Sequence, residues 1–134
     1  MKTGIIILSR FDSRRFPGKA LTPIAGRELL GRVVDRMRKV RNADALIIAT
    51  SNRTVDDPIV QFAQKDNIEC FRGDANDVAG RCHACCQDFK LDHFVRVCGD
   101  SPLIDPVLVM KLIDHMGISC RCYQQCFPKD LACG

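Results

Sequence analysis

Short apolar runs alternate with amphipathic segments along the first 116 residues of the chain. Four runs have few polar positions and the length of buried parallel strands, and they lie at residues 4–9, 45–50, 68–71 and 93–98. Between and after these runs, apolar residues recur at intervals of three and four, which predicts helices packed by one face. The expected helices cover residues 27–40, 56–67, 75–89 and 105–116.

Proline and acidic residues mark where two of these helices begin. Asp56-Asp57-Pro58 and Asp105-Pro106 place a capping carboxylate before a proline in the first turn. Residues 10–26 hold two prolines and two glycines without any period, so we expect a long irregular loop there. The inward-facing residues of the last two helices are expected to be Val78, Cys82, Cys85, Cys86 and Phe89, then Val107, Leu108, Met110, Leu112 and Ile113.

The order of elements, four strands each followed by a helix, predicts an α/β fold. Such alternation is typical of a three-layer α/β/α arrangement with a mainly parallel sheet and right-handed crossovers. We expect a single domain over residues 1–134, of which residues 117–134 form an irregular, cysteine-rich tail. Ligands of such sheets bind at the carboxyl ends of the strands. Candidate site residues are therefore sought after Leu8, Thr50, Phe71 and Cys98.

The positive charge of the chain is concentrated near its beginning. The net charge is only +4, yet ten arginine and lysine residues fall between Arg10 and Arg41. This local field suits a polyanionic small molecule, or else a solvated helix face. With 6% aromatic residues, the composition does not favour nucleic acid as a partner. We find no export signal and no run long enough to cross a membrane, so we expect a cytoplasmic protein with no membrane partner.

The nine cysteines all lie in the second half of the chain. Their odd number and the absence of an export signal argue against a disulfide framework. Cys82-His83-Ala84-Cys85 contains a CxxC spacing, for which a zinc site is conceivable. The same cysteines fall on the apolar face of an expected helix, where free cysteine behaves as a small hydrophobic residue, and we favour that interpretation.

The first loop contains the largest group of candidate ligand-binding residues in the chain. It follows a buried strand, holds several cations, and contains Pro17-Gly18, a turn that should bring Lys19 back toward the strand end. A triphosphate needs backbone N–H groups and fixed cations to offset its charge. The loop lacks the spacing of a Walker motif. From composition alone, a solvated basic loop remains an equal alternative.

The loop Arg10-x-x-Ser13-x-Arg15-Phe16-Pro17-Gly18-Lys19 resembles the signature of the cytidylyltransferases that activate acidic sugars. The likeness is greatest to the branch named for spore coat polysaccharide biosynthesis protein F, from which Ser9 and Phe16 are mild departures. Three later blocks in the same order are also similar to this branch. They are Ala49-Thr50-Ser51-Asn52 with Asp56-Asp57-Pro58-Ile59, Phe71-Arg72-Gly73 with Asp77-Val78 and Arg81, and residues 95–106.

The resemblance implies a role for each matching residue. Arg10, Lys19 and Asp100 would be catalytic, with Arg10 and Lys19 on the triphosphate and Asp100 binding Mg²⁺. The implied nucleotide-binding residues are Leu8, Ser9, Arg10, Ser13, Arg15, Lys19, Arg72, Gly73, Asp77 and Arg81, of which the last four would lie beside the base and ribose. A carboxylate at a strand's carboxyl end suits a hard cation that bridges phosphate oxygens, although a simple Gly-Asp turn is the alternative. Arg96 would pair with Asp100 or with phosphate.

The implied fold is the Rossmann-like type of the nucleotide-diphospho-sugar transferases, and the implied reaction is transfer of CMP from CTP to a sugar acid. Such enzymes serve the synthesis of surface or spore-coat polysaccharides, and the resemblance leaves a homodimer open. Family members have a second half that supplies the sugar pocket and a further metal-binding aspartate, whereas this sequence ends at Gly134. A nucleotide-binding half-domain or an inactive fragment without turnover is therefore the alternative function.

Overall fold

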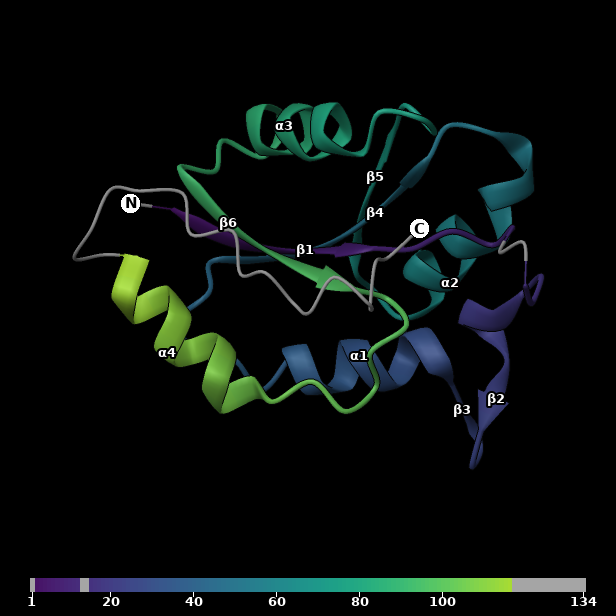
Figure 1. Cartoon of the computed structure of the whole chain (residues 1–134), viewed down its shortest axis with the longest axis horizontal. Coiled ribbons are helices and arrows are strands. Elements are labelled where there is room, and N and C mark those ends of the chain that lie inside the picture. Colours follow the sequence, from purple (N-terminus) through teal and green to yellow (C-terminus); the bar gives the residue numbers. More distant parts are fainter. Residues whose placement is uncertain (1, 13–14, 117–134) are drawn as a thin grey trace.

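A parallel sheet forms the middle layer of the computed structural model. The structure describes residues 2–12 and 15–116, with only the backbone of Met116. Within this part of the chain the sheet has four strands in the order β5-β4-β1-β6 (Figure 1). The strands are β1 (Thr3–Leu8), β4 (Ala45–Ser51), β5 (Glu69–Gly73) and β6 (His93–Cys98). All three pairings are parallel, so the predicted sheet is confirmed.

Helices cover both faces of the sheet (Figure 1). Helices α1 (Leu29–Met37), α2 (Asp57–Lys65) and α4 (Pro106–Met116) share one apolar cluster with the sheet, and α3 (Val78–Asp88) packs in a second cluster. The alternation of side chains along a strand explains the division, because Ile5 and Ile7 belong to the first cluster and Ile6 and Leu8 to the second. The predicted three-layer α/β/α fold is confirmed.

The predicted loop over residues 10–26 contains more structure than the sequence suggested. Residues Lys19–Leu21 form a 3-10 turn, η1, and the two-residue strands β2 (Pro23–Ile24) and β3 (Arg27–Glu28) form a hairpin. Ala25 and Gly26 join these strands with positive φ angles of 52° and 84°, as tight hairpin turns require. Because β3 takes residues 27 and 28, helix α1 begins at Leu29 and not at residue 27 as predicted.

Most other boundaries differ from the prediction by one to three residues, and two of the differences lie near the candidate site. A second 3-10 turn, η2 (Thr54–Asp56), precedes α2. Strand β5 continues through Gly73, so Arg72 and Gly73 end a strand and do not begin a turn. This matters for function because it places both residues on the sheet, at the carboxyl edge.

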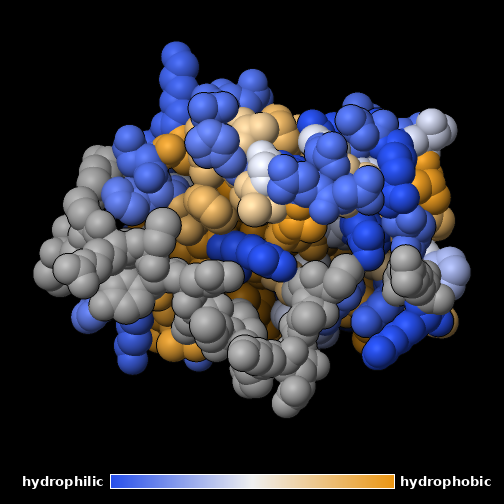
Figure 2. Space-filling view, turned by 45° about the horizontal axis from the view of Figure 1, so that its top comes forward, coloured by the Kyte–Doolittle hydropathy of each residue, from blue (hydrophilic) through white to orange (hydrophobic). Residues whose placement is uncertain are grey.

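The inward face of α4 was predicted in part. Met110, Leu112 and Ile113 pack against the core as expected, but Val107 and Leu108 do not. Val107 and Leu108 are 52% and 51% exposed, whereas Val109 and Ile113 are 5% and 7% exposed and join the core. The helix is apolar on nearly every side over its first turns, so periodicity could not fix its rotation. Apolar surface also lies among polar side chains on the side of the molecule that carries α3 (Figure 2), where β6 leaves Phe94 37% exposed.

Candidate functional site

The loops after β1, β4, β5 and β6 meet at one edge of the sheet because the strands are parallel. The segments after Leu8, Thr50, Phe71 and Cys98, in which site residues were sought, therefore lie at this edge, as the topology requires. Leu8 itself is buried in the core cluster beneath α3. Arg10 is half-buried, Arg15 is exposed, and Ser13 lies outside the described residues.

The first loop folds back on itself through Gly18. Gly18 has φ +75°, and its N–H donates to the Phe11 carbonyl at 2.8 Å. A Cβ at Gly18 would lie 3.2 Å from the Phe11 ring, which packs against this turn. The predicted return of Lys19 toward the strand ends is confirmed, since its Nζ lies 3.7 Å from Oδ2 of Asp100.

Lys19 and Asp100 form the central charged pair of the site. Their side chains are 44% and 51% exposed, so the pair contributes little to stability and both groups remain accessible to a ligand. Asp100 is thus paired with Lys19 rather than with Arg96. The charge of Arg96 instead acts across the α3 face, where it partly offsets the burial that raises the pKa of the Cys82 thiol.

The strand ends beside this pair are packed tightly. The Gly99 N–H donates to the Leu8 carbonyl at 2.9 Å, and a Cβ at Gly99 would lie 2.9 Å from the same oxygen. Ser9 donates its N–H to the Ala49 carbonyl at 3.2 Å, while its buried hydroxyl oxygen has no hydrogen-bond partner within the described residues. Buried hydroxyl groups without a partner are uncommon in folded proteins, so this oxygen is a candidate for a polar contact with a ligand.

Asp56 does not cap α2 as the sequence predicted. Its side chain makes no capping hydrogen bond and is 0% exposed. Oδ1 accepts the Phe11 N–H at 2.7 Å, Oδ2 accepts the Ser51 hydroxyl, and the Arg53 guanidinium lies 3.6 Å away. The carboxylate therefore ties the loop after β1 to the loop after β4, which sequence reasoning missed.

Arg53 makes a second connection between the same two loops. Its Nη2 donates to Oδ1 of Asp12 at 2.8 Å, and its Nε donates to the Ser51 hydroxyl at 3.3 Å. The signal for this network was the polar cluster directly after a buried strand, but nothing local showed which partners these groups would find.

Arg72 is engaged with the protein itself. Its Nε donates to the Ser51 carbonyl at 2.9 Å, its Nη2 to the Arg53 carbonyl at 2.6 Å, and its Nη1 pairs with Oδ1 of Asp57 at 2.8 Å. The guanidinium thus fixes the backbone of the loop after β4. Asp77 also has a structural contact, because its Oδ1 accepts the Gly80 N–H at 2.9 Å and caps α3.

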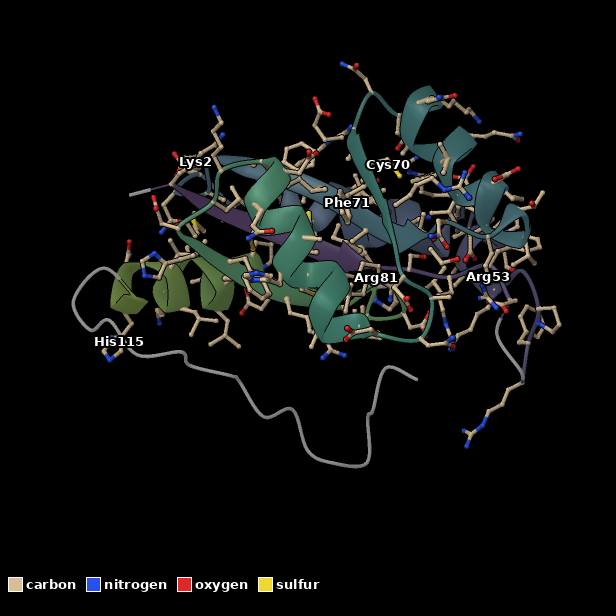
Figure 3. The ribbon with its side chains drawn as sticks, turned by 90° about the horizontal axis from the view of Figure 1, so that it is seen from above. Lys2, Arg53, Cys70, Phe71, Arg81 and His115 are labelled. Carbon is tan, nitrogen blue, oxygen red and sulfur yellow. The ribbon has the colours of Figure 1, made fainter. Side chains whose placement is uncertain are left out.

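Arg81 is a buried cation with unused donors. Its side chain is 2% exposed, and neither Nε nor Nη1 has a hydrogen-bond partner within the described residues. Desolvation lowers the pKa of Arg81, as do the charges of Arg10 and Arg53, while Asp56 raises it. Figure 3 shows Arg81 and Arg53 toward the same end of the sheet. The site therefore concentrates positive charge that an anionic ligand would offset.

Gly73 allows Arg81 to lie where it does. A Cβ at Gly73 would lie 2.8 Å from Cγ of Arg81 and 3.0 Å from the Phe71 ring. Any larger residue at the end of β5 would push the buried guanidinium aside. The sequence-predicted pair Gly73 and Arg81 is thus brought together by direct packing.

The donors that could hold a metal are few. Over residues 2–12 and 15–116, no group of three or more histidine, cysteine or acidic side chains is arranged to bind a metal ion. Asp100 supplies one accessible carboxylate, which fits Mg²⁺ because that ion commonly binds through one or two carboxylates and the phosphates of its substrate. Within the same ranges no helix is both long and apolar enough to cross a membrane.

The helix cysteines do not form the conceivable zinc site within the described residues. Cys82 and Cys85 are 4% and 0% exposed in the core beneath α3. Burial raises the pKa of Cys82 and of Cys86, and raises that of Cys85 to about 12. These thiols are protonated at neutral pH and act as small apolar side chains, as favoured from the sequence. The cysteines from Cys120 onward, in the predicted tail, lie outside the described residues.

Comparison with known proteins identifies relatives of this chain. A family model described as cytidylyltransferase matches residues 4–119. Spore coat polysaccharide biosynthesis protein SpsF of Bacillus subtilis is 34% identical over 112 residues, which cover 81% of this chain and 47% of SpsF. A 3-deoxy-manno-octulosonate cytidylyltransferase of Anaeromyxobacter sp. is 33% identical over 118 residues, covering 86% and 47% of the two chains.

Solved structures show the same relationship. A cytidylyltransferase of Leptospira borgpetersenii superposes with a TM-score of 0.84 at 31% identity, over 89% of this chain and 50% of that one. A CMP:2-keto-3-deoxy-manno-octonic acid synthetase complexed with CTP superposes with a TM-score of 0.77 at 26% identity, over 89% and 48%. The chain thus spans about half the length of these relatives. With the family match covering most of its length, the chain belongs to the cytidylyltransferase family.

Proposed function

We propose that this chain binds CTP at the carboxyl edge of its sheet and takes part in transfer of CMP to a sugar acid. The observation that carries the proposal is the approach of Lys19 to Asp100, which puts a phosphate-binding cation beside a metal-binding carboxylate. Arg10 adds a second cation after β1. A solved relative is named as a complex with CTP, and several relatives are named as 3-deoxy-manno-octulosonate cytidylyltransferases.

In the proposed reaction a sugar hydroxyl attacks the α-phosphorus of CTP. The new phosphorus–oxygen bond forms as the bond to the β-phosphate oxygen breaks, pyrophosphate leaves with that electron pair, and the hydroxyl proton passes to solvent or base. Arg10 and Lys19 offset the negative charge of the triphosphate, and Ser13 and Arg15 shape the loop around it. This use of fixed charges is typical of phosphoryl-type transfer.

Asp100 would hold Mg²⁺, which when bound supplies charge neutralisation between phosphate oxygens. The Lys19 amine then shifts from Asp100 to phosphate, because a multiply charged ligand outcompetes a single exposed carboxylate. Arg72, Gly73, Asp77 and Arg81 are proposed to lie beside the base and ribose, and Leu8 and Ser9 to belong to the nucleotide site. The unpartnered hydroxyl of Ser9 supports a polar contact there.

The product would be a CMP-sugar for the synthesis of a surface or spore-coat polysaccharide, as the name of the SpsF relative suggests. A second candidate is nucleotide binding without turnover. The two candidates differ in whether the chain releases pyrophosphate when a sugar acid is added to Mg²⁺ and CTP.

The first test is calorimetric titration of CTP with Mg²⁺ into the wild-type chain, Lys19→Ala and Asp100→Ala. We expect Lys19→Ala to weaken binding by about 10- to 100-fold, the usual range for one charge-assisted contact. Asp100→Ala should bind with little dependence on Mg²⁺. Lys111→Ala, which removes an exposed lysine of α4, is the matched control and should bind as the wild type does. A folded wild-type chain that does not bind CTP would overturn the proposal.

A further inference from the structure

Asp56 is a fully buried carboxylate for which the proposed chemistry has no direct use. It is 0% exposed, and burial of a charged group is costly unless its oxygens are hydrogen-bonded. Both oxygens are engaged, Oδ1 by the Phe11 N–H at 2.7 Å and Oδ2 by the Ser51 hydroxyl. The buried charge of Asp56 therefore connects the loop after β1 to the end of β4.

The contact point on the first loop lies between its two cations. Phe11 directly follows Arg10, and its own carbonyl accepts the Gly18 N–H at 2.8 Å, one residue before Lys19. Asp56 therefore holds the N–H of a residue whose carbonyl closes the turn that returns Lys19. Its effect extends to both cations through a single peptide segment.

Arg53 secures the same segment at the next residue. Its Nη2 bonds Asp12 at 2.8 Å and lies 3.6 Å from Oδ2 of Asp56. The backbone of Arg53 is in turn held by Arg72, which donates to its carbonyl at 2.6 Å. Residues 11 and 12 are thus attached to a framework that begins on β4 and β5.

We propose that Asp56, supported by Arg53, is a positioning residue that fixes residues 10–12 and the Gly18 turn in the shape that binds the triphosphate. The inference rests on the proposed function. Binding affinity improves when the groups that contact a ligand are already ordered before it arrives, because their ordering then costs nothing on binding. Asp56 is buried and acts on the loop directly through the Phe11 N–H, and on Asp12 through Arg53.

A merely structural role would reduce stability without a specific effect on the first loop. Asp66 provides a matched control, because it is also a mostly buried acid and pairs with Arg27, but it follows the C-terminal end of α2, whereas Asp56 precedes the N-terminal end. Asp66→Ala should lower the melting temperature and leave CTP affinity unchanged. Asp56→Asn should retain part of the function, because its amide oxygen still accepts from Phe11 and its NH₂ group donates to the Ser51 hydroxyl.

The experiment measures CTP–Mg²⁺ affinity by calorimetry, the melting temperature, and amide hydrogen exchange at Phe11 without ligand. For Asp56→Ala we expect CTP affinity to fall about 10- to 100-fold, the cost of ordering two long cationic side chains on binding. We also expect amide hydrogen exchange at Phe11 to accelerate more than exchange in the core strands. Asp56→Asn should have a CTP affinity and a Phe11 exchange rate between those of the wild type and Asp56→Ala, and it replaces the alanine variant if that variant does not fold.

The outcomes separate the two proposals. Failure of the folded wild-type chain to bind CTP overturns the proposed function. Wild-type affinity in a folded Asp56→Ala or Asp56→Asn chain, with Phe11 exchange no faster than in the Asp66→Ala control, overturns the positioning role alone. Equal loss of affinity in Asp66→Ala would also overturn it, because the effect would then follow general destabilisation.

Discussion

Gly99→Ala is expected to destabilise the fold by about 1–3 kcal/mol, the usual range for overpacking a close contact. The added Cβ would lie 2.9 Å from the Leu8 carbonyl oxygen and 3.1 Å from Cβ of Ser9. Ordinary carbon–oxygen contacts are about 3.3–3.6 Å, so the ends of β1 and β6 would have to separate. The same carbonyl accepts the Gly99 N–H at 2.9 Å, and separation would lengthen that bond.

The assay is thermal unfolding followed by circular dichroism. A loss of this size corresponds to a melting temperature lower by roughly 5–10 °C for a chain of this length. Gly4→Ala is the control, because it adds the same methyl group at the opposite end of β1. There the new Cβ meets only the end of the Leu91 side chain, at 2.5 Å, which can rotate away, so the loss should be smaller. An unchanged melting temperature in Gly99→Ala would refute the reasoning.

Two further predictions follow from buried ionisable groups. The hydrogen bond from Arg27 lowers the pKa of Asp66 below its ordinary value of 3.8. The stabilisation by this carboxylate is therefore present above pH 4 and is lost as the pH falls through the lowered value. In urea unfolding, the free energies of wild type and Asp66→Asn should converge in acid, and a difference that is constant with pH would contradict this. Burial raises the pKa of Cys85 to about 12. At pH 8.5, iodoacetamide should therefore alkylate Cys85 far more slowly in the folded chain than in the chain unfolded by urea, as measured by mass spectrometry. Equal rates in the two states would disprove the prediction.

The strands could be predicted because burial on both faces of a sheet leaves an uninterrupted apolar run in the sequence. Residues 5–8 are apolar without interruption, and each side chain of this run enters one of the two cores. The rotation of α4 could not be predicted, since Val107, Leu108 and Val109 offer three equivalent candidates for one inward position. Only the packing against the sheet selects Val109.

The parts of the candidate site that follow from the parallel topology and from the family resemblance could be predicted. Both placed Lys19 and Asp100 at one edge of the sheet, and the structure brings them to 3.7 Å. Asp56 shows where sequence reasoning ends. An aspartate before a helix has a local interpretation, as a cap, and its actual partner, the Phe11 N–H, lies 45 residues away. A contact of that separation leaves no local pattern.

The central place of β1 has a consequence for how the protein is made. Strand β1, which is made before the other three strands of the sheet, is held by β4 on one side and by β6 on the other, and its register with β6 joins Thr3 to His93. At about 5–20 residues per second, translation needs roughly 5–20 s to produce that last neighbour. During this interval an apolar strand has an unpaired edge. An unpaired apolar edge is a template for pairing with other chains, so we expect the nascent chain to be most prone to association until β6 has been made.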